Sequence, residues 1–532
     1  MREVKLLDCT LRDGGYVNNW HFGKNAIRDI LFNLSKAGMD IIECGFLTDK
    51  PYQPDDSIFS SPQQINALLP SGSKSMFVAM IAIGEKEMDP ALLPPAQEYG
   101  LSGIRLTFHS DEIEKALRYG RIIQEKGYRL FMQPVGSSFY PDEQLIDLIL
   151  KVNQLHPYAF YIVDTLGTMY QRDLQRQLYL ADYNLEKGIC IGFHSHNNLQ
   201  MAFANAQHLL DYKTDRTILI DCSANGMGRG AGNLCSELIM DYINQTTPGR
   251  YDTLPLLELV DQYLSSVYVS SPWGYSYVYF LSAANGCHPN YASYLLSQQT
   301  LHVNTIGEIL EQIPQGSRKR FDKDLIKSIY QSFQKNAVDD TQLTDHFRKL
   351  FHNKTVLAVA PGKTVATENQ KIRDYIAKHD PFVICINFIP ESIRADLFFV
   401  TSVKRYEMLE NRLEDQKTVL TSNVPANQKF TQIINYAPLT NTSSYASDSA
   451  GTMLLKWLVK CSVKQVALAG FDGFDAGASN YVEEKYNAFI TKEALEQKNR
   501  EIQLQLEKRA QDLDIQMITS SLYSIENQRE RQ

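Results

Sequence analysis

The sequence predicts an α/β protein: a TIM-type (β/α)8 barrel, then a helical extension, and then a second, Rossmann-like α/β domain. Short apolar runs alternate with longer amphipathic runs over residues 1–250. Residues 251–350 show apolar side chains at helical spacing. The alternation of strands and helices resumes over residues 351–532, which include a predicted C-terminal helix. Because strands that alternate with helical patterns indicate βαβ units, both α/β regions should contain a parallel sheet.

The predicted barrel begins with a strand at residues 4–7. A helix follows it, because the apolar residues between Lys24 and Lys36 recur at helical spacing. Seven further strands are predicted at residues 41–46, 75–82, 103–107, 129–134, 159–164, 189–194 and 217–221. Helical patterns separate them, for example at residues 111–126, 141–154, 171–187 and 199–212. Eight such units match a TIM barrel in number and size, whereas a doubly wound open sheet, the alternative, rarely needs eight even repeats.

The composition narrows the class of partner. Lys and Arg total 53 against 61 Asp and Glu, and the net charge of -8 argues against nucleic acid or an anionic membrane surface as the main partner. No stretch approaches 18 uninterrupted apolar residues and the N-terminus shows no export signal, so no membrane insertion is expected. The 8 cysteines form no CxxC pair, which fits the reduced thiols of a cytoplasmic protein.

Polar residues follow the predicted strands where the catalytic groups of such a barrel lie, at the carboxyl ends. Arg12 and Asp13 come after the first strand, and Glu43 lies on the second. Asp164 and Thr165 end the sixth strand, where we expect them to contact the substrate. Because the carboxyl ends of the strands meet at one rim, these side chains should face a common site.

Two histidines, His194 and His196, end the seventh predicted strand. Residues two apart in a strand point to the same face, so both imidazoles can aim at one ion. Such a pair alone arises by chance, and a single histidine often satisfies a core hydrogen bond. Together with Asp13 at the same rim, the pair forms a facial set of ligands that leaves positions open for substrate oxygens.

A glycine-rich loop, residues 221–234, follows the eighth strand and precedes an apolar helix. Its glycines allow close backbone approach, and amides at the start of the helix could hold a carboxylate or a phosphate. We therefore expect Gly228 and Asn233 to contact the substrate. Alternatively, the segment is a flexible loop in which Asn233 only caps the following helix.

The motifs DCTLRDGG, IIECGF, DTLG, HSHNN and NGMGRGAGN resemble those of the DRE-TIM metallolyase (HMGL-like) superfamily over residues 1–290. This superfamily includes 4-hydroxy-2-oxovalerate aldolase, 2-isopropylmalate and homocitrate synthases, and 3-hydroxy-3-methylglutaryl-CoA lyase. The resemblance implies a divalent cation, Mn²⁺ or Mg²⁺ with Zn²⁺ as an alternative, on Asp13, His194 and His196. It also implies that Arg12 stabilises the enolate of a 2-oxo acid. Either Asn225 or Asn233 would support the metal region.

The branch of the superfamily to which the chain belongs depends on which residue acts as the catalytic base. The aldolases carry a histidine three residues after the metal-binding aspartate, and this chain has Tyr16 there. Tyr16 would act as a base only with a lowered pKa or through water. His21 is a nearby substitute in the sequence, with an ordinary surface histidine as the alternative. Tyr277 aligns with an active-site tyrosine of the aldolases, although the alternating tyrosines around it could form one packing face.

The other branches fit less well. The Claisen synthases carry a glutamate where Arg229 stands. The lyases need a cysteine within the run of glycines, residues 226–232, which Cys222 precedes and Cys235 follows. We therefore expect an aldolase that makes or cleaves a carbon–carbon bond through a pyruvate-type enolate, with 2-oxo acid and aldehyde substrates. A Claisen-type acyltransferase that uses an acyl-CoA is one alternative. A binding or scaffold protein with a degenerate barrel is another.

The regions after the barrel carry fewer chemical signals. In the aldolases a comparable helical extension contacts a partner dehydrogenase, whereas here a cap or the surface of a homo-oligomer is the default expectation. In the third region Gly362, Lys363 and Thr364 form a glycine turn before a helix that could bind a phosphate or a nucleotide. The spacing is not that of a P-loop, so an ATPase is not expected.

Four motifs of the third region, APGKT, CINF, DLFFVTS and AGFDG, are similar to nucleotide-sugar-using, sialyltransferase-like domains of bacterial surface polysaccharide biosynthesis. A non-catalytic binding or oligomerising domain is the alternative.

Overall fold

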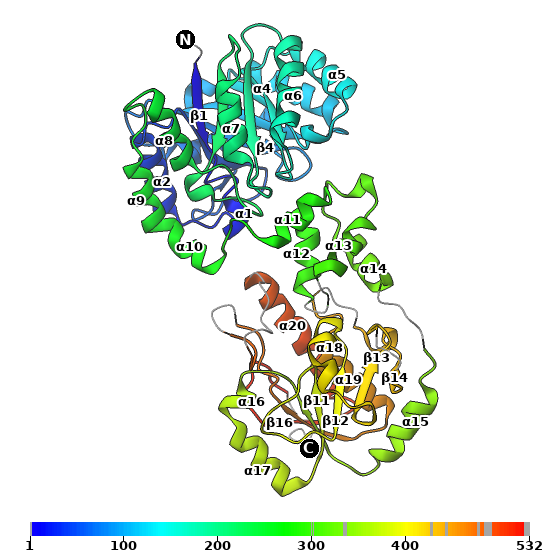
Figure 1. The fold of residues 1–532 in the computed structure, drawn as a ribbon. Helices are drawn as coiled ribbons and strands as arrows, with labels where there is room; N and C mark the ends of the chain where they lie inside the picture. The colour runs from blue at the N-terminus through cyan, green and yellow to red at the C-terminus, as the bar shows by residue number, and fades with distance from the viewer. Residues whose placement is uncertain are drawn as a thin grey trace. The chain divides into compact units, whose positions relative to one another are not determined.

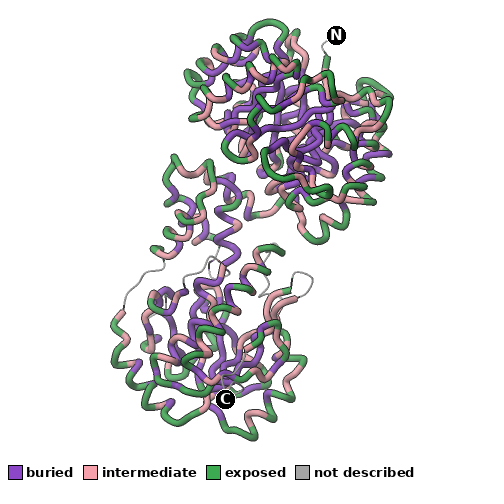
Figure 2. Tube along the Cα trace, turned by 180° about the vertical axis from the view of Figure 1, so that it is seen from behind, coloured by how far each residue is buried: buried purple, intermediate pink, exposed green. Residues whose placement is uncertain are grey.

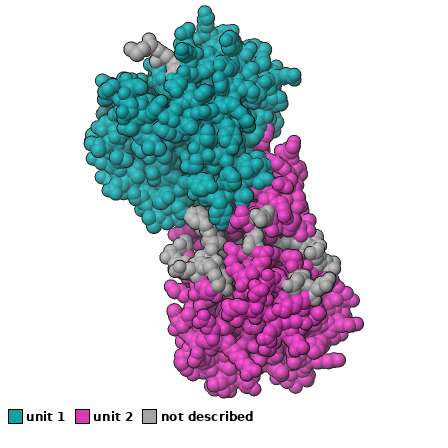
Figure 3. Space-filling view, in the orientation of Figure 1, with its two compact units in different colours: residues 1–289 teal, residues 290–532 magenta. Residues whose placement is uncertain are grey.

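The computed structural model describes residues 3–298, 301, 303–333, 338–425, 429–441, 445–475, 479–483 and 492–525. The chain divides into two compact units, residues 1–289 and 290–532, which Figure 3 shows in different colours. This division falls within the predicted helical extension, and the three-part division at residues 250 and 350 stays a prediction. No described helix is long and apolar enough to cross a membrane.

The first unit contains a closed barrel of eight parallel strands, which confirms the predicted fold (Figure 1). Neighbouring strands pair in the order β1-β9-β8-β7-β6-β5-β4-β2, and β1 also pairs with β2, which closes the cylinder. The strands are β1 (Val4–Asp8), β2 (Ile41–Leu47), β4 (Met76–Ala82), β5 (Leu101–Phe108), β6 (Arg129–Pro134), β7 (Ala159–Asp164), β8 (Cys190–Ser195) and β9 (Ile218–Cys222). A short strand, β3 (Ile58–Phe59), pairs with β2 outside the cylinder.

Helices surround the barrel, whose strands are mostly buried, and Figure 2 shows buried segments inside a more exposed outer layer. The helices of the first unit are α1 (Gly15–Asn18), α2 (Lys24–Lys36), α3 (Pro62–Asn66), α4 (Ile113–Glu125), α5 (Asp142–Asn153), α6 (Gln171–Asn184), α7 (Ala202–Asp211), α8 (Ser236–Thr246), α9 (Leu254–Leu259), α10 (Ser265–Ser270) and α11 (Tyr277–Ala284). The four apolar residues of α2 at helical spacing, Ile27, Ile30, Leu31 and Leu34, are buried, as the sequence predicts.

Alternate strand residues point to opposite sides of the barrel wall. One apolar cluster lies inside the cylinder and includes Leu219, whereas the other lies between strands and helices and includes Ile220. The same alternation continues at the carboxyl ends of the strands. It places Glu43, His194 and Asp221 on the inner side, where a site can form.

The second unit contains a parallel sheet in the order β14-β13-β12-β11-β10-β15-β16, which confirms the predicted second α/β domain. Its strands are β10 (Val356–Val359), β11 (Phe382–Ile386), β12 (Leu397–Val400), β13 (Thr418–Thr421), β14 (Ile433–Ile434), β15 (Gln465–Ala469) and β16 (Asp514–Met517). The sheet extends in opposite directions from β10 and β15, so their carboxyl ends form a topological switch point.

The helices that follow the first unit are α12 (Pro289–Ser297), α13 (Val303–Glu311), α14 (Lys323–Phe333), α15 (Thr341–Leu350), α16 (Thr364–Thr367), α17 (Asn369–His379), α18 (Val403–Leu409), α19 (Ala450–Lys460) and α20 (Lys492–Arg509). Trp457 of α19 is fully buried and stacks on Phe399 of β12. This contact anchors α19 on the sheet, with the start of the helix near the switch point.

Candidate active site

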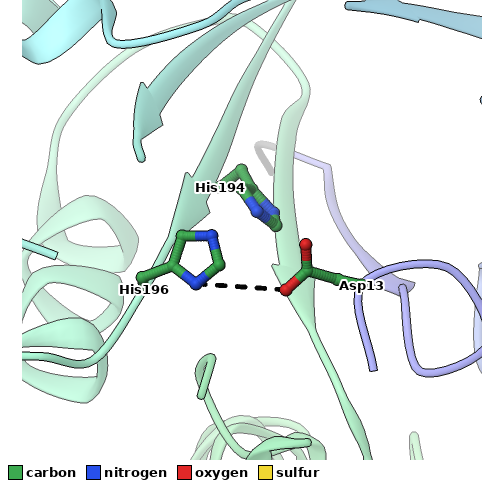
Figure 4. A group of neighbouring side chains, drawn as sticks. All are labelled: Asp13, His194 and His196. Atoms are coloured by element: carbon green, nitrogen blue, oxygen red, sulfur yellow. Dashed lines mark ion pairs between the residues drawn. The ribbon is translucent and has the colours of Figure 1, made fainter. Parts of the chain in front are cut away.

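Three side chains form a candidate metal centre at the carboxyl ends of β1 and β8 (Figure 4). Asp13 follows β1, and His194 and His196 lie at the end of β8. One ligand atom from each residue lies within 4.8 Å of the others, and all three side chains are buried. Asp13 Oδ2 and His196 Nδ1 are 3.9 Å apart. Two imidazole nitrogens and one carboxylate oxygen suit a divalent metal ion.

The hydrogen bonds of the two imidazoles agree with this role. Nδ1 of His194 lies 2.9 Å from Asp221 Oδ2, which leaves Nε2 available as a ligand. A ligand histidine commonly donates its other nitrogen to a carboxylate in this way. Nδ1 of His196 is buried and has no hydrogen-bond partner among the described residues. Because a buried polar atom without a partner costs free energy, this nitrogen is suited to bind an ion.

The protonation states of the group also suit metal binding. Burial opposes the charge of Asp13, but the Arg12 guanidinium and the two imidazoles outweigh burial and hold the pKa of Asp13 well below its usual range. Burial is the main cause that lowers the pKa of His196 to about 3, so this imidazole is neutral at physiological pH. Metal ions bind ionised carboxylates and neutral imidazoles.

Arg12 is held between two carboxylates. Its Nε donates to Glu43 Oε2 at 2.8 Å, and its Nη1 donates to Asp13. All three side chains are more than nine-tenths buried. Within the described part of the chain Nη2 of Arg12 has no hydrogen-bond partner, so this nitrogen is left for a substrate oxygen. The residue expected to stabilise an enolate therefore lies beside the metal group.

Arg105, which the sequence patterns do not single out, joins the two sides of the site. It is fully buried on β5 and donates to Glu43 Oε2 at 2.6 Å and to Asp221. Asp221 in turn bonds to His194. Glu43, predicted as a catalytic residue, accepts hydrogen bonds from Arg12 and Arg105. These bonds position the two guanidinium groups.

The glycine-rich loop after β9 closes one side of the metal group. Asn233 Nδ2 donates to Asp13 Oδ2 at 2.8 Å. A Cβ on Gly228 would lie 2.5 Å from Asn233 Nδ2 and 2.8 Å from Asp13 Oδ2, so this position requires glycine. The main-chain amide of Asn225 bonds to Glu237, at 3.1 Å. Of the two loop asparagines, Asn233 therefore forms a hydrogen bond to a predicted metal ligand, Asp13.

Tyr16 is protonated near neutral pH. Burial is the main cause that raises the pKa of Tyr16 to about 12. Its hydroxyl donates to Glu85 Oε1 at 3.1 Å, and the Arg229 guanidinium carbon lies 3.8 Å from the centre of its ring. The phenol therefore does not serve as an ionised base at this position.

Arg229 connects His288 to Tyr16, because it contacts both side chains. The sequence patterns do not mark His288 as a site residue. It is buried after α11, and its Nε2 lies 3.1 Å from Arg229 Nη1. Burial, followed by the charges of Arg229 and His196, lowers the pKa of His288 well below its usual range, so the imidazole is neutral. The surrounding motif NGCHPN has no spacing that marks a catalytic histidine.

Two other predicted residues, Asp164 and Thr165, hold the turns at the rim. Asp164 accepts from two amides of the following turn at 2.9 and 3.0 Å. Burial raises the pKa of Asp164 to about 6 in spite of these bonds. Thr165 Oγ1 accepts from the Gly136 amide at 2.8 Å. These contacts fix the loops after β6 and β7, and contact with a substrate stays a prediction.

The structure places His21 and Tyr277 on more exposed surface. The side chain of His21 is 67% exposed and pairs with Asp56 at 2.9 Å. Tyr277 begins α11 and is 48% exposed. Neither residue has a described contact with the metal group, and their catalytic roles stay predictions.

In the second unit a carboxylate occupies the predicted phosphate turn. Asp472 accepts from the Thr364 amide at 2.8 Å and also from the Thr364 hydroxyl. The amide that would hold an anion is thus already bonded. Phosphate binding by Gly362, Lys363 and Thr364 stays a prediction that the structure does not strengthen.

Comparison with known proteins identifies a family. Residues 106–261 match the family described as HMGL-like. The chain is 27% identical over 284 residues to an oxaloacetate decarboxylase from Mycobacterium tuberculosis, covering 52% of this chain and 79% of that protein. It is 26% identical over 280 residues to a 4-hydroxy-2-oxovalerate aldolase from Roseiflexus castenholzii, covering 51% and 80%. A crystallised N-terminal domain from Bacteroides vulgatus is 24% identical, covers 57% of this chain and 98% of its own, and has a TM-score of 0.49. The first unit therefore contains an HMGL-like domain of the DRE-TIM superfamily of lyases and aldolases.

Proposed function

We propose that the first unit is a divalent-metal-dependent aldolase that makes or cleaves a carbon–carbon bond through the enolate of a 2-oxo acid. The observation that carries the proposal is the group of Asp13, His194 and His196, with the Arg12 guanidinium beside it. An enolate carries negative charge on a carbonyl oxygen, and fixed positive charge in a buried site stabilises it better than water does. A divalent ion, for which we propose Mn²⁺ or Mg²⁺, would supply part of that charge when bound.

Arg12 supplies positive charge from the protein itself. Its bonds to Glu43 and Asp13 fix the guanidinium plane, and Nη2 remains to donate to the oxygen on which charge develops. Removing one such preorganised donor typically costs about 100- to 1000-fold in rate. Arg12→Gln should therefore lower kcat strongly, because the neutral amide has neither the charge nor the fixed geometry.

For proton transfer we propose His288. Aldol cleavage needs a group that accepts the proton of the 4-hydroxyl group. Tyr16 holds its own proton at neutral pH, and His21 lies in an exposed ion pair. His288 is a buried imidazole, and its bond to Arg229, which lies over Tyr16, brings it near the position at which the aldolases carry their histidine. Its pKa is lowered well below the usual range and Arg229 donates to its Nε2, so His288 would accept the proton once a bound substrate draws Arg229 away and restores the basicity of the ring.

Tyr16 also favours a second candidate, decarboxylation of a 2-oxo diacid such as oxaloacetate. Loss of CO₂ leaves the electron pair of the broken bond on the enolate, so no base has to remove a hydroxyl proton. A protonated phenol at position 16 is compatible with this reaction. The relative named oxaloacetate decarboxylase, aligned over 284 residues, supports it as well.

Pyruvate release from two substrates tests the proposal. The full-length protein with Mn²⁺ is given 4-hydroxy-2-oxovalerate or oxaloacetate, and pyruvate is measured through lactate dehydrogenase, with enzyme-free Mn²⁺ as the blank. We expect cleavage of 4-hydroxy-2-oxovalerate that EDTA abolishes and that Asp13→Asn lowers at least about 100-fold. Asp142→Asn, on the exposed surface of α5, is the matched control.

The outcomes separate the candidates. If His288→Gln lowers aldol cleavage, the base is supported, and pyruvate from oxaloacetate alone favours the decarboxylase. No pyruvate from either substrate, or activity that survives both EDTA and Asp13→Asn, contradicts the metal-dependent enolate chemistry.

A further inference from the structure

The second unit contains a cavity at its topological switch point. The cavity has a volume of about 140 Å³ and lies at the carboxyl ends of β10 and β15. Open parallel sheets bind their ligands in the crevice at this point. Gly470 permits the close approach of the two strand ends, because a Cβ there would overlap the Ala360 carbonyl oxygen. The metal centre belongs to the first unit, so the function proposed above does not use this cavity.

Buried cationic side chains line the cavity. Lys498, on α20, is 6% exposed, and within the described residues its ammonium makes one hydrogen bond, to the Ser297 carbonyl oxygen at 3.4 Å. An ammonium has three donors, so Lys498 has donors left for a ligand. Arg405, on α18, is also 6% exposed and lies 5.2 Å from the centre of the Tyr481 ring. A buried ammonium that keeps donors at a cavity favours an anionic ligand, because a buried charge needs an opposite charge and hydrogen bonds to offset its desolvation.

The amino-terminal end of α19 meets the same cavity. Residues 449–452 line it, and the Ser449 side chain makes no capping hydrogen bond to a described amide. The first amides of a helix have no partner within the helix, and this end carries partial positive charge. With Lys498 in the same lining, the helix end suits a phosphate group.

Carboxylates near Lys498 already accept hydrogen bonds from the protein. Asp448 accepts from the Tyr330 hydroxyl, and Glu501 accepts from two main-chain amides at 2.6 and 2.9 Å. Burial is the main cause that lowers the pKa of Lys498 to about 8, while the two carboxylates raise it. The ammonium is therefore charged at pH 7 and retains donors for an anion.

The rest of the lining is aromatic and polar, and it includes the carboxylates of Asp448 and Asp472, which accept hydrogen bonds from Tyr330 and Thr364. Phe471, Phe474 and Tyr523 contribute rings, and Asn387 and Ser402 contribute amide and hydroxyl groups. Aromatic side chains bind planar rings through stacked or edge contacts, and a few polar groups fix the orientation of a ligand. A ligand that uses the whole cavity thus combines a planar ring, polar substituents and an anionic group.

We propose that this cavity binds a nucleotide. Its phosphate lies at the start of α19 beside Lys498 and Arg405, its sugar meets the polar groups, and its base lies among the aromatic rings. Inorganic phosphate would use only the first of these parts, and a nucleoside would use only the others.

Calorimetric titration of the full-length protein tests the proposal. The probes are ribonucleoside 5′-monophosphates and 5′-diphosphates, with the parent nucleosides and pyrophosphate as partial ligands. At least one nucleotide is expected to bind with a Kd at least tenfold lower than its nucleoside and than pyrophosphate. No binding of any nucleotide at millimolar concentration overturns the proposal. A partial ligand that binds as tightly as every nucleotide overturns it as well.

A matched pair of variants tests the role of Lys498. Lys498→Met keeps the length of the side chain and removes its charge, and it should raise the nucleotide Kd at least tenfold. Lys508→Met, at an exposed position of the same helix, should leave the Kd unchanged. An unchanged Kd in folded Lys498→Met contradicts the assignment.

A second measurement uses the unaltered chain, in case Lys498→Met does not fold. Reductive methylation with formaldehyde, followed by mass spectrometry, gives the modification rate of each lysine. Bound nucleotide should slow methylation of Lys498 and not of Lys508. Equal rates at Lys498 with and without the nucleotide overturn the proposal.

Discussion

Asp221 is the residue whose replacement best probes how the site is held. Its Oδ2 accepts from His194 Nδ1 at 2.9 Å and from the buried Arg105. Asp221→Asn keeps an oxygen for both donors but removes the charge that makes the imidazole more basic. Loss of such a partner typically lowers metal affinity by about 10- to 100-fold, which corresponds to about 1.4 to 2.8 kcal/mol. Arg105 keeps its bond to Glu43, so we expect a folded variant whose loss of stability lies at the lower end of the range for a broken buried ion pair, about 3 kcal/mol.

Electron paramagnetic resonance of free Mn²⁺ measures this effect. A titration gives the Kd of the wild type, of Asp221→Asn and of the surface control Asp142→Asn, and circular dichroism checks that each protein is folded. We expect the Kd to rise by about 10- to 100-fold in Asp221→Asn alone. A folded Asp221→Asn protein that binds Mn²⁺ within about threefold of the wild type refutes the reasoning, because the carboxylate then does not tune His194.

Three further replacements have definite expected results. Gly228→Ala should lower Mn²⁺ affinity at least tenfold in the same titration, because the added methyl group displaces Asn233 from Asp13. An unchanged affinity would contradict the close approach of Gly228 to Asn233 and Asp13. Tyr16→Phe should leave the rate of pyruvate release within about threefold of the wild type, because a phenol with a pKa of about 12 is not the base. A loss of about 100-fold would instead indicate that Tyr16 is the base. Burial raises the pKa of Asp8 from 3.8 to about 7. Between these two values the folded protein keeps a proton that the unfolded chain releases. Asp8 therefore lowers the free energy of unfolding progressively as pH rises from about 4 to 7. The urea midpoint of Asp8→Asn relative to wild type should therefore rise across that range, and a difference that does not change with pH counts against this view.

The barrel could be predicted because its signals are local. Each of its strands is an apolar run that ends in polar residues or glycine, and the observed bounds lie within two residues of the predicted ones. In the second unit β14 and β16 lack such a signal. β14 has two residues, and β16 reads Asp-Ile-Gln-Met, so neither carries a clear apolar pattern. Pairing with β13 and β15 decides that these segments are strands.

The site could be predicted where sequence spacing fixes geometry. His194 and His196 are two residues apart at a strand end, and closure of the barrel brings Asp13 to them. Arg105 and His288 could not be predicted in the same way. Arg105 is one charged residue in an apolar strand, and its role depends on carboxylates 62 and 116 residues away. His288 reaches the site through Arg229, 59 residues earlier in the chain, and no periodic pattern encodes such a contact.

The metal content of the full-length protein tests the central claim most directly. After incubation with Mn²⁺ and gel filtration, elemental analysis should find about one ion per chain in the wild type and less than about a tenth of that in His196→Ala, which removes one of three ligands. His379→Ala, at an exposed position of α17, should retain the ion. A wild-type protein without bound ion, or a His196→Ala protein that keeps a full complement, would contradict the claim that Asp13, His194 and His196 form a metal centre.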